Sequence, residues 1–274
     1  MIAWRVDVIG LLVVGALLVV GVPAAMYLAQ DSLLFLPHLA AAPPGTARVP
    51  RPVEELAYAT PDGVQLRGWL VRGRVSPAPL VVYYGGNAEN VTWQALEPWP
   101  EDWSLALVHY RGYGASEGKP SERALYADAE LVFDALARRP DVDASRIVLA
   151  GRSLGTGVAT HIATIRPVRG VILVSPYDSM VEVAQRHYPF LPIGLLLKHP
   201  FDSLARAGAI DAPLLAIVGG RDTIIPPAHS QRLYEAWRGP KRWVEVPGAD
   251  HNDLGLQPEF WAPIRESLEA ARGG

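Results

Sequence analysis

Short apolar runs alternate with longer amphipathic segments along most of the chain. Six of these runs are continuously apolar, which is typical of strands buried on both faces of a parallel sheet. They are Leu80–Tyr84, Leu105–His109, Ile147–Ala150, Val171–Val174, Leu214–Val218 and Trp243–Val246. Segments of helical periodicity lie between them, at Ala88–Leu96, Glu122–Arg138, Leu154–Ile165, Ala228–Trp237 and Glu259–Ala271. The alternation predicts an α/β fold with a mostly parallel central sheet and helices on both of its faces.

A predicted hairpin and a proline-rich segment precede this pattern. Glu55–Thr60 and Val64–Val71 read as two strands joined by a turn at Thr60-Pro61-Asp62-Gly63. The stretch before them carries prolines at 37, 43, 44, 50 and 52, which favours an extended linker over residues 31–52. We therefore expect the main domain to occupy residues 53–274.

The N-terminal segment Val8–Ala29 contains no charged residue. As a helix, its 22 residues would span roughly 33 Å, enough to cross the hydrocarbon core of a bilayer. Residues 1–30 are therefore predicted to form one transmembrane anchor. A cleaved signal peptide, with Val22-Pro23-Ala24 as its small-residue site, is the alternative. Because the anchor holds no strand of the sheet, deleting residues 1–30 is expected to leave the fold unchanged.

The charges around this segment predict its orientation. Arg5 and the N-terminal amine, offset by Asp7, precede it, and Asp31 follows it with no Lys or Arg before Thr46. The positive-inside rule then places the C-terminal domain on the exported, periplasmic or extracellular side.

Composition narrows the classes of function. The net charge of −3, from 25 basic and 28 acidic residues, gives no electrostatic reason to expect nucleic acid as a partner. Because the chain has no cysteine, it can have no disulfide, thiolate metal site or cysteine nucleophile. The 50% apolar fraction predicts a large buried core. We expect a monomer that needs no metal and no organic cofactor.

The segment Gly151-Arg152-Ser153-Leu154-Gly155 lies between a predicted strand and a predicted helix. This is the G-x-S-x-G pattern of a nucleophile elbow, for which about 0.1 chance matches are expected in a chain of this composition. A sharp strand-to-helix turn would expose the Ser153 hydroxyl at the edge of the sheet. Ser153 is therefore the predicted nucleophile.

A serine nucleophile needs a histidine base and a carboxylate that orients it. Asp222 follows the strand Leu214–Val218, and His251 follows the strand Trp243–Val246, in the order that an elbow of this kind requires. Asp178 and Asp202 are rival acids, although Asp178 suits a turn and Asp202 suits a helix N-cap. Asp222 and His251 are the predicted partners of Ser153.

A third loop, Tyr84-Gly85-Gly86-Asn87-Ala88, follows the strand Leu80–Tyr84. Backbone N–H groups of such a loop and of the residue after the nucleophile commonly stabilise an oxyanion. The predicted oxyanion donors are the backbone N–H groups of Leu154 and Asn87. An ordinary glycine turn that leads into a helix is the alternative for this loop.

Together these motifs resemble the α/β-hydrolase superfamily, more narrowly its membrane-anchored serine-hydrolase branch. The resemblance is carried by Gly85–Asn90, Tyr110–Gly118, Gly151–Gly155, Ser175–Ser179 and Gly220–Asp222. Within that branch it is similar to depalmitoylase-like, lysophospholipase-like and serine aminopeptidase-like domains. The family often has His-Gly where this chain has Gly85-Gly86. The resemblance implies an α/β-hydrolase fold, a Ser153–Asp222–His251 triad, and cleavage of carboxylic esters or thioesters of acyl or lipid-like substrates through an acyl-enzyme.

Two questions stay open at this point. The same triad would also serve a peptidase or an acyltransferase, and the domain could be a binding module without activity. Residues 176–208 form a long excursion between two strands, with an apolar, proline-broken part at Tyr188–Leu197. We expect a small cap that forms an acyl-binding wall or touches lipid, with a core-packed excursion as the alternative.

Overall fold

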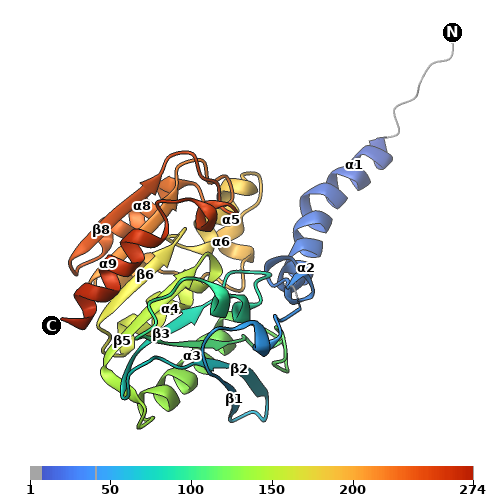
Figure 1. The fold of residues 1–274 in the computed structure, drawn as a ribbon. Helices are drawn as coiled ribbons and strands as arrows, with labels where there is room; N and C mark the ends of the chain where they lie inside the picture. The colour runs from blue at the N-terminus through green and yellow to red at the C-terminus, as the bar shows by residue number, and fades with distance from the viewer. Residues whose placement is uncertain (1–7, 41, 274) are drawn as a thin grey trace.

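An eight-stranded sheet forms the centre of the computed structural model, which describes residues 8–40 and 42–273 (Figure 1). The strand order is β1-β2-β4-β3-β5-β6-β7-β8. The bounds are β1 Val53–Ala59, β2 Gln65–Val71, β3 Ala78–Tyr84, β4 Ser104–Val108, β5 Val142–Arg152, β6 Gly170–Val174, β7 Leu214–Gly219 and β8 Lys241–Val246. Strand β2 pairs antiparallel with β1 and β4, and all pairs from β4 to β8 are parallel. The predicted hairpin and mostly parallel sheet are confirmed.

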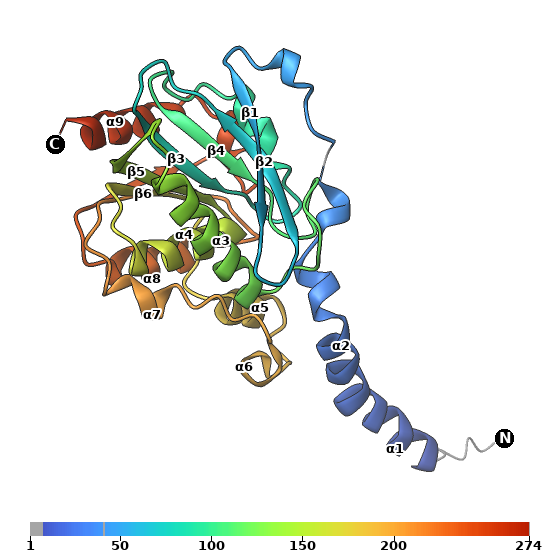
Figure 2. The same ribbon diagram turned by 90° about the horizontal axis from the view of Figure 1, so that it is seen from below.

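Helices cover both faces of this sheet (Figure 2). One face packs against α3 (Glu122–Ala137), α4 (Leu154–Ile165) and α8 (Pro227–Ala236), and the other against α9 (Trp261–Arg272). Every residue of β3, β6 and β7 is buried, as their continuous apolar runs predict. Residues at the carboxyl ends of these strands therefore meet at one edge of the sheet.

The expected helix Ala88–Leu96 is shorter than predicted and of another type. Residues Val91–Leu96 form a 3₁₀ helix, η4, which begins after Asn90. The Asn90 side chain accepts a hydrogen bond from the Thr92 N–H (3.1 Å), and Ala88 has a positive φ of 60°. These local interactions keep residues 88–90 outside the helix.

The expected cap contains three short helices, α5 (Met180–His187), α6 (Ile193–Leu196) and α7 (Leu204–Ala207). The Ser179 hydroxyl caps α5 by accepting from the Glu182 N–H (3.1 Å). Asp202 accepts from the Ala205 N–H (2.9 Å) and so caps the first turn of α7, the role expected for it. Prolines 189 and 192 end the helical pattern between α5 and α6.

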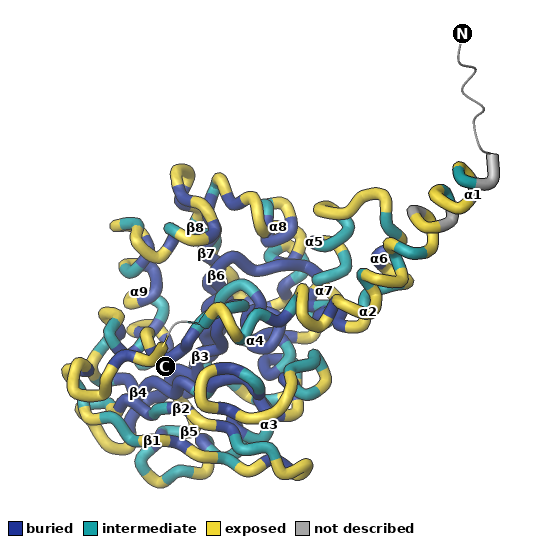
Figure 3. Tube along the Cα trace, turned by 90° about the vertical axis from the view of Figure 1, so that its right-hand side faces the viewer, coloured by how far each residue is buried: buried dark blue, intermediate teal, exposed yellow. Residues whose placement is uncertain are grey.

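The N-terminal apolar segment is helical and extends away from the rest of the molecule (Figures 1 and 3). It comprises α1 (Val8–Ala16), a π-helical turn η1 (Leu17–Gly21) and α2 (Val22–Leu34). By length and composition it holds one helix that is long and apolar enough to cross a membrane. Arg5 and Asp7, on which the predicted orientation depends, lie outside the described residues.

The junction after α2 differs from the expected free linker. Helix α2 continues to Leu34, and the Phe35 side chain is buried in the domain core, with 3% of its surface exposed. Its ring contacts those of His199 and Phe201 edge-on, at centroid distances of 5.2 and 6.4 Å. The end of the N-terminal helix is therefore part of the packed domain, and the irregular segment begins only after it.

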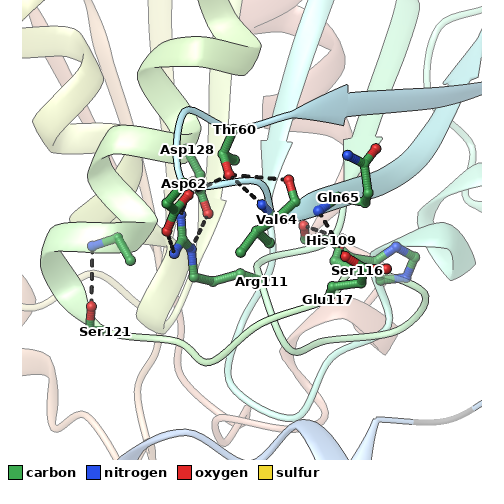
Figure 4. A network of polar contacts seen from close by, with 11 residues as sticks. Thr60, Asp62, Val64, Gln65, His109, Arg111, Ser116, Glu117, Ser121 and Asp128 are labelled. Carbon is green, nitrogen blue, oxygen red and sulfur yellow. Dashed lines mark hydrogen bonds and ion pairs between the residues drawn. The ribbon is translucent and has the colours of Figure 1, made fainter.

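An ion-pair network joins the hairpin turn to the loop after β4 (Figure 4). Arg111 forms a bidentate pair with Asp128 of α3 (2.7 and 2.6 Å) and a further pair with Asp62 of the turn (2.9 Å). The Arg111 guanidinium lowers the pKa of Asp62 to about 2. Bidentate pairing fixes the direction of the 110–118 loop, which carries Tyr113 towards the candidate site.

Candidate active site

Ser153 lies at the sharp turn between β5 and α4. Its backbone has φ 50° and ψ −118°, a strained conformation for a residue that is not glycine. A Cβ on Gly151 would lie 2.6 Å from the Gly155 carbonyl oxygen, and one on Gly155 would lie 2.1 Å from that of Tyr84. Only glycine fits at both positions, and the predicted elbow geometry is therefore present.

Three side chains from separate loops form one hydrogen-bonded chain at this turn. His251 Nε2 lies 3.0 Å from Ser153 Oγ, and His251 Nδ1 lies 2.7 Å from Asp222 Oδ2. A histidine protonated on Nδ1 satisfies both contacts, because it donates to the carboxylate and accepts from the hydroxyl. Asp222 and His251 are buried, whereas Ser153 is partly exposed. The structure thus brings the three predicted residues together.

The other oxygen of the Asp222 carboxylate is held by two backbone donors. Asp222 Oδ1 accepts from the backbone N–H groups of Ile224 (3.0 Å) and Ile225 (2.7 Å). The neighbouring Arg221 N–H donates to the Ala249 carbonyl (2.9 Å), which ties the Asp222 loop to the His251 loop. These contacts hold the carboxylate in one orientation towards His251.

The rival acids lie elsewhere. Asp178 is fully buried and pairs with His229 (2.9 Å) and Arg232 (2.6 Å) of α8. Asp202 caps α7, as described above. Of the acidic side chains weighed from the sequence, Asp222 is the one that contacts His251.

The loop after β3 lies beside the nucleophile. A Cβ on Gly86 would be 3.6 Å from the Cβ of Ser153. The Gly86 N–H donates to Glu89 Oε2 (2.7 Å) and so is not available to substrate. The backbone N–H groups of Leu154 and Asn87 have no acceptor among the residues that the structure describes. These two groups remain the candidates for an oxyanion hole.

Sequence reasoning missed a polar pair that connects the three loops. Arg152 donates to the His251 carbonyl (3.2 Å) and lies 3.6 Å from Glu89 Oε2. Glu89 Oε1 in turn accepts from the Tyr83 hydroxyl (2.9 Å), whose pKa is raised well above its usual value by burial. Arg152 lies inside the elbow motif, and a basic side chain at that position needs a nearby acceptor. Its presence in the motif could therefore have indicated this pair.

The side chain of Asn87 also has a role that was not predicted. Asn87 Nδ2 donates to the Leu34 carbonyl (2.6 Å), and Oδ1 accepts from the Leu36 N–H (2.9 Å). The Tyr113 hydroxyl donates to the same oxygen (2.8 Å). Asn87 therefore binds the end of the N-terminal helix with its side chain, on the loop whose Gly86 lies beside Ser153. This contact spans more than fifty residues of sequence, so local pattern gave no sign of it.

Three cavities lie near these elements, and none of them is lined by Ser153, Asp222 or His251. One of about 220 Å³ lies between α2 and the cap, and one of about 170 Å³ adjoins Arg152 and Asn252. The third, about 820 Å³, lies along β1, β2 and the segment 37–43, and none of the three triad residues lines it. Within residues 8–40 and 42–273, no group of three or more His, Asp or Glu side chains is arranged to hold a metal ion.

The chain is similar to several proteins of known sequence, although no family model matches it. The uncharacterized protein Rv2307c of Mycobacterium tuberculosis is 38% identical over 247 residues, covering 88% of this chain and 87% of the relative. The alpha/beta hydrolase domain-containing protein WAV2 of Arabidopsis thaliana is 30% identical over 286 residues, covering 93% and 92%. The uncharacterized membrane protein YNL320W of Saccharomyces cerevisiae is 32% identical over 227 residues, covering 79% and 80%.

Solved structures share the fold. The acetyl xylan esterase from Paenibacillus sp. R4 matches with a TM-score of 0.66 at 21% identity, covering 80% of this chain and 83% of that one. The Pyrococcus furiosus esterase Pf2001 matches with a TM-score of 0.67 at 19% identity, covering 84% and 97%. At these identities the likeness supports the fold and leaves the reaction to the residues of the site.

Proposed function

The chain belongs to the α/β-hydrolase superfamily, and we propose that it is a serine hydrolase that cleaves carboxylic ester or thioester bonds through an acyl-enzyme. The observation that carries this proposal is the hydrogen-bonded chain Asp222–His251–Ser153 at a strained strand-to-helix turn. Such a chain supplies the base that a weak hydroxyl nucleophile needs. The esterases among the structural neighbours share the fold on which this site is built.

In the proposed acylation step, Ser153 Oγ attacks the carbonyl carbon of the substrate. His251 Nε2 takes the hydroxyl proton, and Asp222 stabilises the resulting imidazolium through its contact with Nδ1. The imidazolium then gives its proton to the departing alcohol or thiol as the C–O or C–S bond breaks. Deacylation repeats the sequence with water as the nucleophile and returns Ser153 to its starting state.

Negative charge develops on the carbonyl oxygen during both steps. We assign its stabilisation to the backbone N–H groups of Leu154 and Asn87. Leu154 is the first residue of α4, so the positive end of the helix dipole acts in the same direction. The pair of Arg152 and Glu89 holds the loops that carry these donors and His251 in one arrangement.

We further propose that the N-terminal helix anchors the enzyme to a membrane, with the catalytic domain on the exported side. The exposed apolar side chains of α1 and α2 and the yeast relative described as a membrane protein support the anchor. Retention of the full-length chain in the membrane pellet after a carbonate wash is expected. A soluble, shortened chain would indicate a cleaved signal peptide instead.

A panel of p-nitrophenyl esters and acyl thioesters tests the proposed reaction directly. The full-length protein in detergent should release nitrophenol or thiol, and Ser153→Ala should release neither above background. Peptide substrates run in parallel separate a hydrolase of esters from a peptidase. Turnover of peptides alone, or equal turnover by Ser153→Ala, would contradict the proposal.

A further inference from the structure

The cavity of about 220 Å³ has one wall from the N-terminal helix and one from the cap. The wall on α2 includes Met26, Leu33 and Leu34, and the wall on the cap includes residues of α5 and α6. Its lining is predominantly apolar: Met26, Tyr27, Gln30, Leu33, Leu34, Met180, Val183, Ala184, His187, Tyr188, Leu191, Ile193, Leu196 and Leu197. We call this cavity the helix–cap groove.

Polar contacts fix the two walls against each other. Gln30 Nε2 donates to the Leu196 carbonyl (3.1 Å), and Gln30 Oε1 accepts from the Lys198 N–H (2.7 Å). At the next residue, Asp31 pairs with the buried His199 (3.0 Å). These contacts lie at the base of a helix that is otherwise exposed (Figure 3), and they give the groove a defined width.

Residues that line the groove on each side contact loops of the candidate active site. On one side, Leu34 lines the groove and its carbonyl accepts from Asn87, whose N–H is a proposed oxyanion donor. On the other side, His187 lines the groove and contacts the Ile224 carbonyl (2.9 Å). The Ile224 N–H in turn donates to Asp222 (3.0 Å). One wall is thus hydrogen-bonded to the loop of a proposed oxyanion donor, and the other to the loop of the triad carboxylate.

We propose that the helix–cap groove binds the acyl chain of the substrate, so that the N-terminal helix is part of the substrate site as well as an anchor. This inference rests on the proposed hydrolase function. The volume is below the roughly 300–1,000 Å³ of pockets for drug-sized ligands and suits one flexible chain. An apolar chain gains free energy from leaving water for such a lining.

The surroundings of the groove favour an occupant that comes from a bilayer. The same cap segment exposes Phe190 (97%) and Leu195 (87%), and α2 exposes Leu28 (77%). Large exposed apolar side chains of this kind mark contact with lipid or protein. Because α2 both lines the groove and belongs to the apolar N-terminal helix, an acyl chain that follows α2 out of a bilayer would meet the groove.

The test measures selectivity for chain length in the full-length enzyme in detergent. The readout is the ratio of kcat/KM for dodecanoyl to that for butanoyl p-nitrophenyl ester. Ala184→Phe fills the groove from α5 and should lower this ratio by about tenfold or more, because the long chain loses buried contact area. Ala270→Phe makes the same change at an exposed position of α9 outside the groove and should leave the ratio unchanged.

A second pair of variants tests the wall on α2 and does not depend on a buried substitution. Leu33→Gln places a polar group in the groove lining at a residue that is 56% exposed and should lower the ratio. Leu28→Gln makes the same change on the same helix but outside the lining, and it should leave the ratio unchanged.

The outcomes separate the two proposals. A wild-type enzyme without any ester turnover would contradict the hydrolase function itself. Normal turnover with an unchanged ratio in both Ala184→Phe and Leu33→Gln would overturn the groove and leave the hydrolase function standing. If Leu28→Gln lowered the ratio as much as Leu33→Gln does, the effect would belong to the N-terminal helix in general. That result would also overturn the proposed role of the groove.

Discussion

At the scale of single residues, the site depends on a strained serine that is held by its neighbours. The positive φ of Ser153 costs about 1–3 kcal/mol, which the glycines and the packing of β5 on α4 offset. Residue types and their spacing were enough to predict Ser153, Asp222 and His251, because each follows the end of a strand that local pattern signals. The Arg152–Glu89 pair was not predictable in this way, since its partners come together only through the sheet order.

The acid assignment gives a prediction at this scale. Asp222→Asn should lower kcat on the order of 10⁴-fold with the fold intact, because an amide no longer holds the productive histidine tautomer. Ester turnover and thermal unfolding of the purified variant measure the two effects.

Asp178→Asn is the control for this change. It removes a fully buried carboxylate from His229 and Arg232, so the melting temperature should fall strongly. The kcat of the folded enzyme should change little. A larger loss of kcat in Asp178→Asn than in Asp222→Asn would show that the acid is misassigned.

At the scale of elements, the sheet was predictable and the junction of the N-terminal helix was not. Each strand of β3–β8 carries its own apolar run, so its existence follows from local pattern. The contacts of Gln30 with Leu196 and Lys198 join residues more than 160 positions apart, and no local pattern signals them. The expectation that residues 1–30 can be removed without consequence has to change for that reason.

Gln30→Ala tests this junction. The substitution removes both hydrogen bonds and leaves a part-buried carbonyl and N–H without partners, which costs roughly 1–2 kcal/mol. For a domain of this size the melting temperature should fall by about 2–8 °C, measured by thermal unfolding in detergent.

Ser32→Ala is the matched control on the same helix. Its hydroxyl bonds only to the Ala29 carbonyl within α2 and is exposed, so the melting temperature should stay within about 1 °C of the wild type. Equal melting temperatures for Gln30→Ala and the wild type would mean that α2 is not tied to the cap in solution.

At the scale of the whole molecule, carboxylates paired with arginine connect the antiparallel edge of the sheet to the rest of the domain. Hydrogen bonds from Arg139 lower the pKa values of Glu54 in β1 and of Asp141, which precedes the buried part of β5. The hydrogen bonds from Arg111 lower the pKa of Asp62 to about 2. These groups bind fewer protons in the folded than in the unfolded chain at acidic pH.

Their stabilisation is therefore present above the unfolded pKa values, about 3.9 for Asp and 4.3 for Glu, and is lost as the pH falls through the lower folded values. We predict that the contribution of these carboxylates to the melting temperature is nearly constant from pH 7 to about pH 5 and falls steadily below that. Arg139→Met should be less stable at neutral pH and should show a shallower fall in acid. Parallel melting profiles for this variant and the wild type would contradict the role of the pair.

The central claim is that Ser153 is the nucleophile of a serine hydrolase. The most direct measurement is labelling of the full-length enzyme with a fluorophosphonate probe, followed by mass spectrometry of the modified peptide. We predict one adduct, on the Ser153 hydroxyl, and a loss of ester turnover in proportion to labelling. Ser153→Ala and His251→Ala should form no adduct. An adduct on another residue, or an enzyme that turns over esters but is never labelled, would contradict it.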